Sequence, residues 1–293
     1  MPYKLLSNVY YRIYEDHRYL YNVIKFLMYI YHSINGKNNP ISINGWKMKI
    51  HSDDPGISSE LALFKIHEPI STQIFSNLVK GGHYCIDIGA NIGYYALLTA
   101  GIVGKTGHIM ALEPHPANFS KLQENVSINN LSNIDCSNVA CSNYDGEALM
   151  ETSLQSNWHR IAQDNGNGGL KVEARKVDTL ARDFTRLDFI RMDVEGHEYE
   201  VIEGSHNTIE TFRPALFMEF HPTIAGKGKI LRLLTKLKNY GYEIEYFIPR
   251  FLDWPLLGRL SHAKKLTIEE YMLRIEKDDP IYGREANVFL ARI

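Results

Sequence analysis

Residues 84–93 read YCIDIGANIG, and this stretch decides the fold. An apolar run ends near an acid, Asp87, and a turn with Gly89 and Gly93 follows before the chain becomes apolar again. This order predicts a strand, a tight turn and the first turn of a helix. Backbone N–H groups at a helix N-terminus are free to bind a ligand, and the helix dipole favours a carboxylate or a phosphate there. We therefore expect a cofactor site, because glycine lets a ligand approach the backbone closely.

Glu113 is a second acid that belongs with this turn, and it follows the next apolar run. An acid at that distance can accept hydrogen bonds from both ribose hydroxyls of an adenosine. The dinucleotide pattern G-x-G-x-x-G is not present, and Asp87 would repel a pyrophosphate. An acid beside backbone donors instead suits a zwitterion with a sulfonium group, such as S-adenosylmethionine. An NAD-dependent oxidoreductase is the less favoured alternative.

Strand-like and helix-like segments alternate after residue 81. Such alternation predicts an α/β fold with a doubly wound, mostly parallel sheet and helices on both faces. Ligands of these sheets bind beyond the carboxyl ends of the strands. We expect little regular structure at residues 146–180. The predicted strands are 83–89, 108–113, 134–140, 189–193, 215–220, 242–248 and 286–293, and the predicted helices begin near residue 93 and cover 116–129, 198–212 and 230–240.

Residues 1–80 are predicted to form an N-terminal extension of a domain at 81–293. The extension should contain a leading helix, a hairpin around Asn44 and Gly45, and a helical stretch that breaks at Pro69. Larger residues recur at alternating spacings of three and four in the leading helix, which is a heptad pattern. We expect this helix to pack on its own domain. The alternatives for residues 5–31 are a homodimer contact or a peripheral membrane contact.

The composition is that of a globular protein with a full core: 293 residues, of which 44% are apolar and 23% charged. The net charge is −2, so no basic field recruits nucleic acid, and we expect no nucleic-acid partner. The three cysteines show no C-x-x-C spacing, and an odd count argues against a disulfide framework. Because the N-terminus also lacks the pattern of a signal peptide, we expect a cytoplasmic protein, with membrane association as the alternative.

A second polar cluster follows the fourth and fifth predicted strands. Asp193 should lie near the transferred group, where a carboxylate can take or orient the proton of an acceptor hydroxyl. His221 is a candidate general base, because histidine titrates near neutral pH. Glu195 suits catalysis and helix capping equally well. A divalent cation held by these residues and Glu219 is a less favoured alternative, since no short ligand motif supports it.

Four segments resemble the FkbM family of class I S-adenosylmethionine-dependent methyltransferases, and they occur in the order of that family. They are 87–93 (DIGANIG), 112–114 (LEP), 192–204 (MDVEGHEYEVIEG) and 214–219 (PALFME). The resemblance implies a Rossmann-like fold with a seven-stranded sheet. It also implies O-methylation of a sugar, a glycan or another small molecule. A non-catalytic cofactor-binding or scaffold protein is the alternative from a different class.

The resemblance also assigns the cofactor residues. The turn after the first strand would hold the methionine part, Glu113 the ribose, and residues 138–142 would lie near the adenine. The full set of predicted cofactor residues is Asp87, Gly89, Ala90, Asn91, Gly93, Glu113, Pro114, Ala140 and Ser142.

Overall fold

The structure is a computed structural model. It describes residues 30, 39–52, 54, 56–151, 160–162, 169–253, 255, 260–280 and 282–292. Apart from Ile30, the predicted leading helix and the contact expected at residues 5–31 lie outside this described part. Within it, no helix combines the length and the apolar character needed to cross a membrane.

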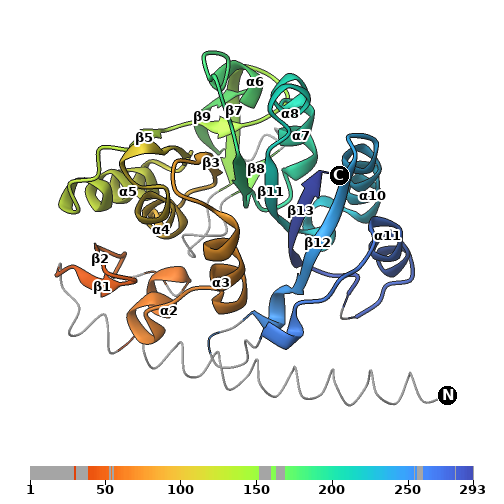
Figure 1. Cartoon of the computed structure of the whole chain (residues 1–293), viewed down its shortest axis with the longest axis horizontal. Helices are drawn as coiled ribbons and strands as arrows, with labels where there is room; N and C mark the ends of the chain where they lie inside the picture. Colours follow the sequence, from red (N-terminus) through yellow and green to blue (C-terminus); the bar gives the residue numbers. More distant parts are fainter. Residues whose placement is uncertain are drawn as a thin grey trace.

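A seven-stranded sheet forms the centre of the protein, with strand order β12-β13-β11-β10-β3-β4-β5 (Figure 1). Neighbouring strands from β11 to β5 are parallel, and β13 is antiparallel to both β11 and β12. The predicted mostly parallel α/β sheet is therefore confirmed. The strands are β3 (Tyr84–Ile88), β4 (His108–Leu112), β5 (Ile134–Ser137), β10 (Phe189–Met192), β11 (Ala215–Phe220), β12 (Tyr242–Pro249) and β13 (Ala286–Arg292).

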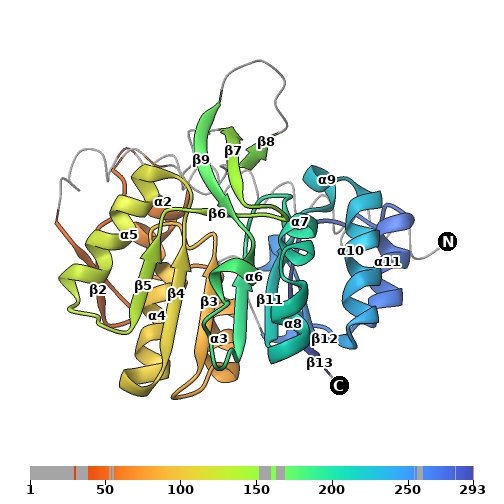
Figure 2. The ribbon, with the colours of Figure 1, turned by 90° about the horizontal axis from the view of Figure 1, so that it is seen from above.

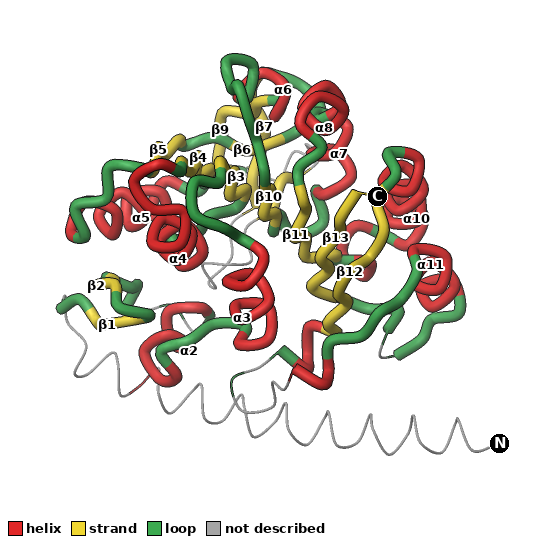
Figure 3. The backbone as a smooth tube through the Cα atoms, viewed as in Figure 1, coloured by secondary structure: helices red, strands yellow, loops and turns green. Residues whose placement is uncertain are grey.

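Helices cover both sides of the row of strands (Figure 3). The predicted helix at 198–212 is wrong in one respect, because it breaks at Gly204 into two helices. A Cβ at Gly204 would lie 2.0 Å from the carbonyl oxygen of Ser142, so the chain there needs glycine. Helix α11 was not predicted, although Thr267 and Glu270 form a capping box at its start. The helices are α4 (Tyr94–Val103), α5 (Pro116–Ile128), α6 (Val177–Leu180), α7 (Glu198–Glu203), α8 (His206–Phe212), α9 (Pro222–Ala225), α10 (Lys227–Asn239) and α11 (Ile268–Glu276).

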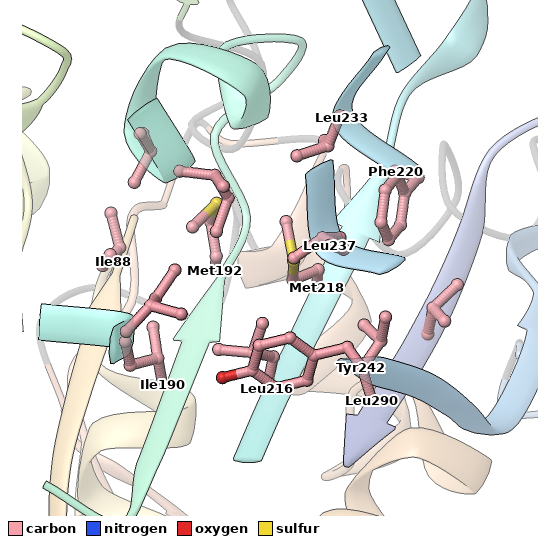
Figure 4. Packing of buried hydrophobic residues seen from close by; sticks show 14 of the residues in the cluster. Ile88, Ile190, Met192, Leu216, Met218, Phe220, Leu233, Leu237, Tyr242 and Leu290 are labelled. Carbon is pink, nitrogen blue, oxygen red and sulfur yellow. The ribbon is translucent and has the colours of Figure 1, made fainter. Parts of the chain in front are cut away.

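The alternation of side chains along the strands builds two hydrophobic layers. On one face, Ile88, Met192 and Met218 pack with Leu233 and Leu237 of α10 (Figure 4). The opposite face carries aromatic and aliphatic residues that pack against α3 and α4. Side chains of a strand alternate between the two faces of a sheet. Three charged residues of β3, β10 and β11 therefore lie on the second face, where Cys85, Phe189 and Phe217 also lie. These are Asp87 on β3, Arg191 on β10 and Glu219 on β11.

The N-terminal extension packs on the central domain. It consists of β1 (Ile41–Ile43), β2 (Trp46–Met48), α2 (Ile57–Phe64) and α3 (Pro69–Leu78), as the hairpin and the break at Pro69 predicted. Asn125 of α5 bonds the backbone of Lys49 in both directions, at 2.7 and 3.0 Å. Phe75 of α3 belongs to the same buried cluster as Phe217 of the central sheet. The hairpin and α3 therefore share a core with the domain they precede.

A second, smaller sheet occupies part of the region where little regular structure was expected. Its order is β6-β9-β7-β8, and it rises above the carboxyl ends of the central strands (Figure 2). The predicted third strand is correspondingly too long: it ends at Ser137, and Ala140 lies in the small sheet. The Asn138 side chain donates to the carbonyls of Glu113 and Pro114, which turns the chain away from the central sheet. The strands are β6 (Ala140–Cys141), β7 (Gly146–Glu151), β8 (Arg160–Ala162) and β9 (Leu170–Arg175).

Candidate active site

A cleft that is open to solvent lies at the carboxyl ends of β3, β4 and β10. The loops after these strands form its floor, and Met150 and Ile161 of the small sheet line it as well. This is the edge where ligands of open α/β sheets bind. The predicted site residues that line the cleft are Gly89, Asn91, Glu113, Pro114, Ala140, Asp193 and Glu195.

The turn after β3 has the backbone geometry that its glycines predicted. Gly89, Asn91 and Gly93 all have positive φ angles, of 79°, 50° and 95°. A Cβ at Gly89 would lie 1.9 Å from the carbonyl oxygen of Asp193, and a Cβ at Gly93 would lie 2.7 Å from Leu122. Glycine is therefore required at position 89 for the close approach of the loops after β3 and β10, and it is favoured at position 93 by the positive φ angle and the contact with α5.

Glu113 is held at the cleft by the backbone. Its Oε2 accepts a hydrogen bond from the Asn91 N–H at 2.8 Å, and its Oε1 accepts one from the His115 N–H at 2.9 Å. The Asn118 side chain donates a third hydrogen bond to this carboxylate, so about one of its four lone-pair sites is left for a ligand hydroxyl. Burial raises the pKa of this carboxyl to about 7, although the hydrogen bonds oppose the shift.

Several predicted cofactor residues support the cleft from behind. Ala90, Gly93 and Asp87 do not line it, and Ala90 and Asp87 are buried. Ser142 is also buried, and its hydroxyl lies 3.0 Å from Nε2 of His197, a residue that does line the cleft. The expected set thus surrounds one site, but only part of it can meet a ligand directly.

Asp87 and Asp193 share one arginine that sequence reasoning missed. The Nη1 atom of Arg191 lies 3.2 Å from Asp87 Oδ1 and donates to the carbonyl of Gly89 at 2.9 Å. Its Nη2 atom donates to Asp193 Oδ2 at 2.9 Å, and the guanidinium lies over the ring of Tyr95 at 4.8 Å. Burial raises the pKa of Asp87, and it raises that of Asp193 to about 6. The sequence did contain a signal for this pairing: Arg191 is the single charged residue in the apolar strand segment FIRM, residues 189–192.

His221 lies among three carboxylates. Its Nδ1 atom is 2.6 Å from Glu198 Oε1, and its Nε2 atom is 3.4 Å from Glu195 Oε2 and 3.6 Å from Glu219 Oε1. Burial lowers the pKa of His221, but Glu195 and Glu219 outweigh it and the pKa is raised well above the usual value. Burial raises the pKa of Glu195 to about 8. His221 and Glu195 therefore form a pair that retains a proton near neutral pH.

Arg250 connects this group to the N-terminal extension. Its Nε atom lies 2.8 Å from Glu219 and 3.2 Å from Glu68, which precedes α3. The Tyr95 hydroxyl donates to the other oxygen of Glu68 at 2.8 Å. Burial opposes ionisation of Glu219, but Arg250 and His221 lower its pKa below the usual range. Neither Arg250 nor Glu68 was predicted, because both come from segments far in sequence from the recognisable motifs.

The residues considered for a cation are close together but already paired. Single atoms of Asp193, Glu219 and His221 lie within 4.8 Å of one another. Arg191 and Arg250, however, neutralise the two carboxylates at 2.9 and 2.8 Å. A divalent cation at this position would therefore compete with two guanidinium groups for the carboxylates.

The strand order and the cleft at the carboxyl ends define an α/β protein of the class I methyltransferase architecture. The methyltransferase FkbM domain matches residues 87–244, more than half of the chain, so the protein belongs to the FkbM methyltransferase family. The family resemblance of the sequence is thereby confirmed.

Other similar proteins are known. Hexuronic acid methyltransferase AglP of Haloferax volcanii is 26% identical over 156 residues, which are 52% of this chain and 61% of that protein. The crystal structure of methyltransferase FkbM from Methylobacillus flagellatus is 16% identical with a TM-score of 0.48, over 78% of this chain and 49% of that one. Fibrillarin from Aeropyrum pernix, solved with bound S-adenosyl-L-methionine, is 13% identical with a TM-score of 0.42, over 76% of this chain and 74% of that one.

Proposed function

We propose that the protein is an S-adenosylmethionine-dependent methyltransferase that acts on a hydroxyl of a sugar, a glycan or another small molecule. The single observation that carries this proposal is that Glu113 and Glu195 line the same cleft. Glu113 is suited to bind a ribose, and Glu195 is suited to act on the acceptor hydroxyl. The acceptor class is supported by membership of the family and by the similarity to a hexuronic acid methyltransferase.

The residues of the cleft fit the cofactor. Glu113 would hold the ribose, since backbone donors fix both of its oxygens and the carboxylate can still accept from a hydroxyl. Gly89 and Asn91 would lie against the methionine part, and Ala140 against the adenine beside Val139 and Cys141. S-Adenosylmethionine would supply an electrophilic methyl group. The chain itself would contribute orientation, exclusion of water and removal of the acceptor proton.

Residues of the loop after β10 would carry out the acid–base chemistry. Glu195 lines the cleft, and burial makes it a stronger base than an ordinary carboxylate. Asp193 lines the same wall but is fixed by Arg191, which suits it to orient a hydroxyl. His221 is absent from the cleft lining and contacts Glu195 from behind. We therefore propose Glu195 as the group that meets the acceptor proton.

Two measurements test this function. Calorimetry should show binding of S-adenosylmethionine and S-adenosylhomocysteine but not of NAD. A methyl-transfer screen against neutral sugars, uronic acids and glycolipids, with magnesium or with a chelator, should identify an acceptor. If no cofactor bound, the proposal would be lost. Cofactor binding without transfer to any acceptor would support the non-catalytic alternative.

A further inference from the structure

Glu198 is a buried acid of the segment 192–204, and it does not line the cleft. It is the first residue of α7 and is 0% exposed. Its Oε1 atom lies 2.6 Å from Nδ1 of His221 and also accepts a hydrogen bond from the Gly196 N–H at 3.0 Å. One carboxylate oxygen thus contacts both the imidazole after β11 and the loop after β10.

The loop that Glu198 holds has an unusual backbone. Glu195 and Gly196 have φ angles of 47° and 94°, and a positive φ is costly for a residue with a side chain. Such strained residues persist only where surrounding contacts fix them. The Gly196 N–H to Glu198 bond is one such contact, and it acts on the residue directly after Glu195.

The contacts of His221 divide between its two ring nitrogens. Nδ1 faces Glu198, whereas Nε2 faces Glu195 at 3.4 Å and Glu219 at 3.6 Å. Of the two carboxylates near Nε2, Glu219 forms an ion pair with Arg250. Glu195 is the one that lines the cleft. A buried acid that binds Nδ1–H fixes the tautomer of a histidine and directs Nε2 toward the chemistry.

We propose, on the basis of the function proposed above, that Glu198 is a positioning residue that holds His221 and Glu195 in one proton relay. In the reaction, the acceptor oxygen forms a bond to the methyl carbon as the carbon–sulfur bond breaks and its electron pair stays on sulfur. Before the transfer, the one proton of the pair moves from Glu195 to Nε2 of His221, and Glu198 stabilises the resulting imidazolium at Nδ1. Glu195 is then an ionised carboxylate and takes the acceptor proton. The pair now holds two protons, and it loses one of them to solvent before the next cycle.

Proton NMR of the full chain with ¹⁵N-labelled histidine tests this role without any acceptor. The wild-type protein should show a strongly downfield proton bound to Nδ1 of His221, because a hydrogen bond to a charged acceptor is short and strong. The resonance is assigned by its loss in His221→Asn. Glu198→Gln should move it upfield, since an amide oxygen is a weaker acceptor. Glu203→Gln is the matched control on α7, because Glu203 pairs with Asn143 and Lys236.

The second readout separates the relay from the cofactor site. In Glu198→Gln, calorimetry should show unchanged affinity for S-adenosylhomocysteine, whereas kcat with an acceptor from the screen should fall roughly tenfold to a hundredfold. If His221 of the wild-type protein carried no proton on Nδ1, the proposal would be overturned. This test does not depend on the folding of any variant. An unchanged Nδ1 resonance in Glu198→Gln would overturn it as well. Failure of the wild-type protein to bind S-adenosylhomocysteine would instead remove the proposed function.

Discussion

Asp87 and Arg191 are neighbours in register on the parallel strands β3 and β10, and their side chains form an ion pair of 3.2 Å beneath the cleft. The side chains are only 4% and 7% exposed. The acid expected to face the cofactor thus has a protein partner, which also binds Gly89 and Asp193. The pair fixes the positions of two loops that line the cleft.

Replacement of Asp87 by alanine should therefore destabilise the fold as well as the site. Removing one partner of a buried ion pair leaves the other charge uncompensated, which typically costs about 3–5 kcal/mol. We expect urea unfolding to show a loss near the lower end of that range, because Asp193 still faces Arg191. Asp183→Asn is the control: its side chain is 90% exposed, and the change should stay within about 0.5 kcal/mol. Equal stability of the two variants would contradict a structural role for the buried pair.

The central fold could be predicted from the sequence because its signals are local. Residues 84–93 predict β3, its turn and the start of α4 from apolar runs and glycines alone. The small sheet could not be predicted in this way. Its longest strands, β7 and β9, alternate between buried and more exposed positions, so no apolar run marks them. Its pairing depends on contacts between distant segments, such as β6 with β9.

Gly89 should be far less tolerant of substitution than Gly45. Both glycines have positive φ angles, of 79° and 85°, so alanine is strained at either position. At Gly45 a Cβ would meet nothing within 4 Å, and the strain alone should cost about 1–2 kcal/mol. At Gly89 a Cβ would overlap the Asp193 carbonyl at 1.9 Å, so the loops must separate at a cost above about 3 kcal/mol.

Thermal unfolding of the two alanine variants measures this difference, and calorimetry measures its effect on the cleft. Gly45→Ala should keep the affinity for S-adenosylhomocysteine, whereas Gly89→Ala should lose it. Similar stability and affinity in the two variants would show that the close approach of the loops after β3 and β10 is not needed.

Binding of the cofactor should depend on pH through Glu113. Burial raises its pKa to about 7, and ribose hydroxyls donate to the ionised carboxylate. The ionised fraction rises as the pH increases through that value, so affinity should increase by about tenfold between pH 6 and pH 8. Calorimetry with S-adenosylhomocysteine at several pH values measures the trend.

Glu113→Gln supplies the control for that experiment. The variant should bind more weakly and lose the pH dependence, because an amide does not titrate. Asp135→Asn, with 73% of its side chain exposed, should behave as the wild-type protein. A pH profile that persists in Glu113→Gln would assign the titration to another group.

The candidate site was only partly predictable, for a physical reason. Motif spacing identified Glu113, Asp193, Glu195 and His221, because each follows a strand of the central sheet. Their partners were missed because they are defined by three-dimensional contacts. Arg250 reaches Glu219 from the chain after β12, and the apolar sequence around it gives no local sign of that pairing.

Residues 39–80 should unfold together with the central domain. Asp253, which follows β12, accepts hydrogen bonds from the N–H groups of Ile70 and Ser71 at 2.7 and 3.1 Å and so caps α3 from outside the extension. Asp253→Ala leaves two buried donors without this acceptor, which should cost about 2–4 kcal/mol. Because α3 shares its core with the central sheet, circular dichroism and fluorescence should report one coincident transition in the wild-type protein and in the variant. A polypeptide of residues 81–293 that folded and bound S-adenosylhomocysteine would instead show that the extension is a separate unit.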